Sequence, residues 1–83
     1  MRFVKIGDSY FNPMRVERIK PAARNDGGKY TPIVKVCLPK KTFYFEPLDL
    51  GLGALTFEEG WAAMGTADAM AVKIVEAVEE ALA

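Results

Sequence analysis

The amino-acid composition of this chain changes sharply near residue 46, and this change limits the folds that the chain can adopt. β-branched and aromatic residues, separated by turn-forming residues, fill the first part, whereas nine of the eleven alanines follow residue 46. Strand formers therefore come first and helix formers last. This order predicts an α+β fold rather than a series of alternating β and α units.

The length of 83 residues leaves room for a single domain. We expect residues 1–46 to form the sheet, residues 47–55 an apolar loop rich in Gly and Leu, and residues 56–83 two helices. A chain this short buries only about 60–65% of the surface that it exposes when unfolded. Its own core is therefore small, and we expect it to form a homo-oligomer.

Turn signals divide the first part into short strands. Residues 2–6 alternate in the manner of a strand, and Gly7-Asp8 is a hairpin signal that lets residues 9–11 return as a second strand. Asn12-Pro13 then begins a helical or 3₁₀ turn, because Asn caps such turns and Pro suits their first position.

A second hairpin is predicted around the segment RNDGGK at 24–29, where Gly27 and Gly28 accept positive φ without steric cost. It links a strand around 16–23 to one around 30–38, and a β-former run at 42–46 follows another turn. The sum is a four- or five-stranded antiparallel meander.

The last third of the chain has the pattern of two helices. Thr56 and Glu59 have the spacing of a capping box, which predicts a short helix that ends at Gly65. Thr66 is then the expected cap of an amphipathic helix over about 67–82. Its wide apolar stripe predicts that this helix packs on one face of the sheet.

The zero net charge hides a division between the two halves. Residues 1–45 hold ten basic and three acidic groups, whereas residues 46–83 hold one basic and eight acidic groups. A basic sheet face predicts an anion site for a nucleotide or nucleic acid, with aromatic rings for base stacking. The candidate residues of that site are Arg18, Lys20, Lys35, Tyr10 and Tyr44. Two alternatives stay open: the basic groups are simply solvated, or two subunits attract each other head to tail.

The apolar segment after the sheet does not have the composition of a solvated loop. Leucines alternate there with glycines, so the segment either covers an open end of the core or packs on another subunit. The candidate residues of an oligomer interface are Leu48, Leu50, Leu52, Leu55 and Trp61.

The residues needed for common catalytic sites are missing from this sequence. There is no histidine, which removes imidazole bases and His-ligated zinc, and a single cysteine cannot form an internal disulfide or a Cys-rich metal site. The glycines form neither a Walker A loop nor a dinucleotide-binding fingerprint. We therefore expect a protein that is not an enzyme and that uses no cofactor and no metal.

The sequence also bears on location. No apolar run approaches the length of a membrane span, and the N-terminus lacks the apolar segment of a signal peptide. We expect a cytoplasmic protein with no membrane partner.

Three segments carry a resemblance: YFNPMRVERI at 10–19, VKVCL at 34–38 and FYFE at 43–46. Their layout resembles that of small flagellar proteins of the FlbD type and of short phage and prophage proteins. The chain departs from the flagellar pattern in its residues 47–65 and in its longer hairpin. The resemblance implies a strand layout with a C-terminal helix and a phage or bacterial source, and it assigns no functional residue.

Together these observations predict a non-enzymatic, homo-oligomeric binding module. By analogy with small phage proteins, it would be an accessory or anti-defence protein that binds a protein or sequesters an anionic nucleotide. The alternatives are a nucleic-acid-binding protein that uses the basic aromatic sheet face, and a purely structural or interaction protein.

Overall fold

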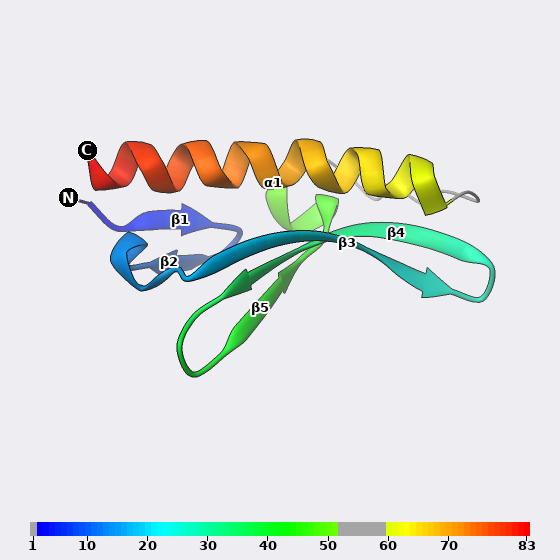
Figure 1. Cartoon of the computed structure of the whole chain (residues 1–83), viewed down its shortest axis with the longest axis horizontal. Helices are drawn as coiled ribbons and strands as arrows, with labels where there is room; N and C mark the ends of the chain where they lie inside the picture. The colour runs from blue at the N-terminus through cyan, green and yellow to red at the C-terminus, as the bar shows by residue number, and fades with distance from the viewer. Residues whose placement is uncertain (1, 52–59) are drawn as a thin grey trace.

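The computed structural model describes residues 2–51 and 60–83, and for Asp26, Trp61 and Ala62 it describes the backbone alone. The fold is α+β, as the order of strand and helix formers predicts (Figure 1). The elements in chain order are β1 (Val4–Ile6), β2 (Ser9–Phe11), the 3₁₀ turn η1 (Pro13–Arg15), β3 (Arg18–Asp26), β4 (Lys29–Cys37), β5 (Thr42–Phe45), the 3₁₀ turn η2 (Pro47–Leu50) and α1 (Gly60–Leu82).

The strands form two antiparallel sheets, so the predicted single meander of four or five strands is not confirmed. β1 pairs with β2, and a separate sheet has the order β3-β4-β5. The chain changes direction between them at η1, where the Asn12 side chain accepts a hydrogen bond from the Met14 N–H and Pro13 begins the turn. Strand β2 then meets β5 through aromatic rings, since the Phe11 and Phe43 rings lie edge to face at 4.9 Å.

Glycines with positive φ lie in the β1–β2 and β3–β4 hairpin turns. Gly7 has a φ of 61°, and Gly27 and Gly28 have φ values of 66° and 91°. Two successive positive values are typical of the type I′ turn, whose twist matches that of the strands it joins. Because this turn needs only two residues, β3 continues to Asp26 and the predicted turn at 24–29 is shortened from both sides.

Helix α1 runs along one side of the molecule, with the β1–β2 hairpin near its C-terminal end and β3 and β4 along its length (Figure 1). The backbone N–H of Arg2 donates to the Ala81 carbonyl at 2.9 Å, which ties the two ends of the chain together. The core between these elements is apolar; it contains Val4, Ile6, Phe11, Val34, Val36, Phe45, Met70, Ala71, Ile74, Val78 and Ala81.

The helical region differs from the sequence-based expectation at Gly65. One helix runs from Gly60 through Gly65 and Thr66 to Leu82, so Gly65 is not a helix end and Thr66 is not a cap. Gly65 does not have a positive φ. A glycine inside a helix lowers the stability of the helix by only about 1 kcal/mol relative to alanine. Continuing the helix keeps Ala63 and Ala67 on the buried side. The beginning of the predicted short helix, at 56–59, lies outside the described residues.

The amphipathic character of α1 is confirmed. Met70, Ile74 and Val78 are buried, whereas the acidic residues Glu76 and Glu79 are exposed. In the part of the chain that the structure describes, no helix is both long and apolar enough to span a membrane.

Candidate functional site

The register of the β3-β4-β5 sheet places three of the predicted anion-site residues in one row. Lys20 lies directly opposite Lys35, and Lys35 lies directly opposite Tyr44. Residues paired in this way point to the same side of a sheet. The neighbours of Lys35 along β4, Val34 and Val36, are fully buried in the core, so the row lies on the side that α1 does not cover. We call this side the outer face.

Arg18 belongs to the outer face as well. It stands two residues before Lys20 on β3 and is paired with Cys37 of β4. Arg18 and Lys20 are exposed, and Lys35 is half-buried. Among the residues that the structure describes, none of these three basic side chains has an ion-pair partner. These three residues therefore give the outer face positive charge that no described ion pair neutralises.

Aromatic rings accompany the lysines of both sheets. The Lys35 Nζ lies 5.9 Å from the centre of the Tyr44 ring, within the range of a cation–π interaction. Tyr10 makes the equivalent contact with Lys5, also at 5.9 Å, but on the β1–β2 hairpin. The structure thus brings four of the five predicted residues onto one face and places Tyr10 in the other sheet. The pairing of Lys5 with Tyr10 across Gly7-Asp8 is readable in the sequence, and the sequence-based site omitted Lys5.

A hollow of about 560 Å³ adjoins the Lys35 and Tyr44 end of the row. Its apolar lining comes from small or buried residues of β3 and β4, and its polar lining comes from β3, β4, β5 and η2. The lining residues are Ala22, Ala23, Arg24, Ile33, Lys35, Tyr44, Glu46 and Asp49. The sequence-based site contains only Lys35 and Tyr44 of these.

The polar side of this hollow is held in place by local contacts. Arg24 forms an ion pair with Glu46. The Glu46 backbone N–H donates to Asp49 Oδ2 at 2.8 Å, as part of a capping box at the start of η2. These contacts hold Glu46 and Asp49, which both line the hollow. The signal in the sequence was the segment Glu46-Pro47-Leu48-Asp49, which has the spacing of a capping box with Pro at the first helical position.

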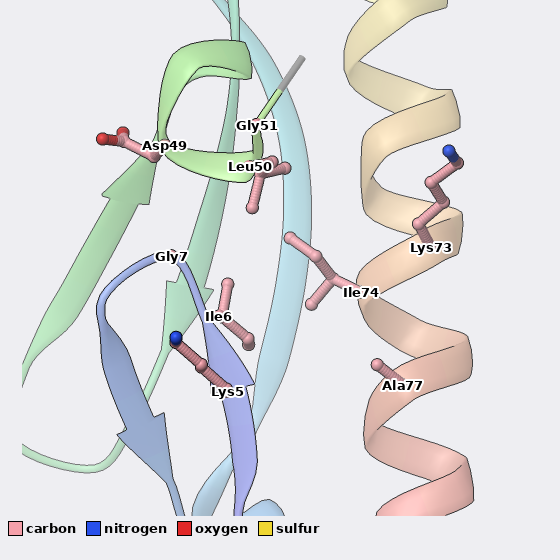
Figure 2. Close-up of a pocket in the computed structure, with 9 residues that line it drawn as sticks. All are labelled: Lys5, Ile6, Gly7, Asp49, Leu50, Gly51, Lys73, Ile74 and Ala77. Atoms are coloured by element: carbon pink, nitrogen blue, oxygen red, sulfur yellow. The ribbon is translucent and has the colours of Figure 1, made fainter.

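A second cavity of about 410 Å³ lies between β1, η2 and α1. Figure 2 shows the side chains of Ile6, Leu50 and Ile74 turned toward one another, with Lys73 and Asp49 directed away from them. Ile6 and Ile74 belong to the hydrophobic core, and Leu50 packs against it. The cavity is therefore part of the packing between η2 and α1.

The predicted interface residues are only partly described. Leu48 is 64% exposed, whereas Leu50 is half-buried against the core. A 3₁₀ turn has about three residues per turn, so Leu50 lies on the same side as the buried Pro47 and Leu48 does not. Leu52, Leu55 and the side chain of Trp61 lie outside the described residues.

No protein-family model, no curated protein and no solved structure matches this chain. The resemblance to flagellar and phage proteins therefore stays a prediction, and the chemistry of the outer face is the basis for a functional proposal.

Proposed function

We propose that this protein is a non-enzymatic binding module that holds a phosphate-bearing ligand with a flat base, either single-stranded nucleic acid or a free nucleotide. The binding surface is the outer face of the β3-β4-β5 sheet. The observation that carries this proposal is the direct opposition of Lys20 and Lys35, which have no ion-pair partner among the described residues.

In the unbound protein, the two facing lysines lower the stability of the sheet. Like charges directly opposite each other destabilise a sheet, by an amount within the roughly 0.2–1 kcal/mol range of cross-strand pairs. A bound phosphate would turn this repulsion into two favourable contacts. Arg18 extends the basic row on the same face, and its planar guanidinium suits a phosphate oxygen pair.

Tyr44 provides the second chemical feature of the site. Tyr44 is 60% exposed, and its ring adjoins Lys35. Stacking of a base on an aromatic side chain contributes about 1–3 kcal/mol and tolerates any base. Cations and an exposed ring in one row therefore support a ligand that combines phosphate with a base.

The test is the affinity for a fluorescein-labelled oligonucleotide of fifteen thymidines, measured by fluorescence anisotropy as salt is varied. With three phosphate contacts from Arg18, Lys20 and Lys35, the slope of log K against log salt should be about −2 for a single strand. Raising the salt from 50 to 200 mM should then weaken binding roughly 20-fold. Undetectable or salt-independent binding would contradict the proposal.

Matched variants locate the binding surface. Lys20→Gln and Lys35→Gln should each weaken binding and reduce the salt slope by about 0.7. Lys73→Gln removes the same charge from α1, and we expect it to leave both quantities nearly unchanged. Equal losses in all three variants would show that net charge, not the outer face, controls binding.

A second candidate function is self-association, favoured by exposed apolar side chains. Leu48 is 64% exposed. On α1, Val72 is 54% exposed and Leu82 is 46% exposed. We propose that a second copy of the chain covers Leu48 and Val72. Leu48→Asp and Val72→Asp should lower the particle mass in native mass spectrometry at low salt. A monomeric wild-type protein, or variants with an unchanged mass, would contradict this candidate. Leu50→Asp is unsuitable because Leu50 packs on the core.

A further inference from the structure

We propose that the hollow beside Tyr44 holds a single nucleobase and selects guanine. This inference rests on the proposed function, because the basic row would position the phosphates next to the hollow. It adds a preference for one base, which a basic face with one tyrosine does not provide.

The size and lining of the hollow suit a base. Its volume of about 560 Å³ lies within the roughly 300–1,000 Å³ of small-molecule sites. Ala22 leaves space because its side chain is small, and Ile33, which is paired with it, is buried to 7% exposure. These residues provide an apolar surface for a flat ring, and the exposed Tyr44 ring provides a stacking partner.

The polar side chains that line the hollow determine which hydrogen-bonding edge of a base can bind there. Glu46 and Asp49 line the hollow, and carboxylate oxygens only accept hydrogen bonds when ionised. The Glu46 carboxylate accepts from Arg24 and from the Asp49 backbone N–H, and because a carboxylate has about four acceptor sites it keeps capacity for a further donor. Asp49 Oδ2 accepts from the Glu46 N–H, which leaves its Oδ1 as a further acceptor.

Guanine is the base whose edge best matches adjacent acceptors. Its ring N1–H and its exocyclic amino group are neighbouring donors that one carboxylate can accept together. Thymine and uracil place a carbonyl oxygen on each side of their single ring N–H, and these oxygens would face the carboxylates. Edge recognition of this kind discriminates between bases wherever the base is unstacked and accessible.

The experiment compares three pentadeoxynucleotides with equal numbers of phosphates: TTGTT, TTTTT, and a version with inosine in the centre, which lacks the exocyclic amino group. We expect TTGTT to bind about five- to tenfold more tightly than TTTTT, with the inosine version closer to TTTTT. Glu46→Gln should reduce this preference to less than twofold, because it removes the carboxylate that accepts from the guanine edge. Asp49→Asn tests the second carboxylate at an exposed position, and the asparagine keeps a carbonyl oxygen that can accept from the Glu46 N–H.

The outcomes separate the two proposals. Salt-dependent binding of all three strands with equal affinity would overturn the guanine preference and leave the proposed function standing. Binding of none of them, and of neither GMP nor TMP, would overturn both. A preference that persists in Glu46→Gln and Asp49→Asn would also overturn this inference. GMP should also bind more tightly than TMP by the same factor, because the hollow contacts the base alone, and equal affinities of GMP and TMP would contradict the guanine preference.

Discussion

Lys20 and Lys35 stand directly opposite each other on neighbouring antiparallel strands, and both point away from the helix that covers the other side of the sheet. Tyr44 continues the same row on β5. The alternation of a strand accounts for this arrangement: Val34 and Val36 enter the core, so the residue between them must face outward. The row is thus a direct consequence of how the core is packed.

We first predict that Lys20→Glu stabilises the protein. The substitution replaces a like-charge pair with an attractive one, and the free energy of unfolding should rise by up to about 1 kcal/mol. Urea unfolding in 20 mM salt measures the change, which should shrink at 500 mM salt because exposed charges are screened. Lys40→Glu makes the same change in the exposed bend between β4 and β5 and serves as the control. A destabilised Lys20→Glu variant would show that the opposition of the two lysines carries no repulsion.

We next predict that replacing glycine with alanine changes the stability of the protein in opposite directions at two positions. Gly65 lies inside α1 without a positive φ, and a Cβ there would meet nothing within 4 Å. Gly65→Ala should therefore stabilise the protein by about 0.5–1 kcal/mol. Gly28 has a φ of 91°, so Gly28→Ala should destabilise it by about 1–2 kcal/mol. Thermal unfolding of the two variants checks both signs, and a destabilising Gly65→Ala would be inconsistent with one continuous helix.

The packing of α1 on the sheets can be checked with two valines of that helix. Val78 is buried in the core and Val72 is 54% exposed. Val78→Ala should lower the free energy of unfolding by about 1.5–2 kcal/mol, from the loss of buried methyl groups. Val72→Ala should change it by less than about 0.5 kcal/mol. Similar losses in the two variants would mean that Val72 is covered in solution, which would support self-association through α1.

The single cysteine reports on the outer face without any substitution. Cys37 is half-buried, is paired with Arg18 and stands two residues after Lys35 on the same face. A saturating oligonucleotide should therefore slow the reaction of Cys37 with a maleimide severalfold. The Lys20→Gln, Lys35→Gln double variant should lose this protection under the same conditions. An unchanged labelling rate in the wild-type protein would place the ligand away from the outer face.

Local sequence patterns predicted several features correctly. The alternation around Lys35, the turns at Gly7-Asp8 and Gly27-Gly28, and the amphipathic last helix all appear in the structure. Each depends on residues close in sequence, such as glycines that tolerate positive φ or apolar residues with a period of two. The prediction that a helix ends at Gly65 was wrong because it considered neighbouring residues alone. Burial of α1 along its length outweighs the small cost of one glycine inside the helix.

The sequence by itself determined the class of fold, the positions of the turns and the basic character of the strands. Only the tertiary structure decided that the strands divide into two sheets, that Tyr10 is separated from Tyr44, and that Ala22, Ile33, Glu46 and Asp49 line one hollow. The physical reason is that turns and periodicity are set by neighbouring residues. Strand register and the position of η2 depend instead on which apolar faces are buried together, and that is a property of the whole chain.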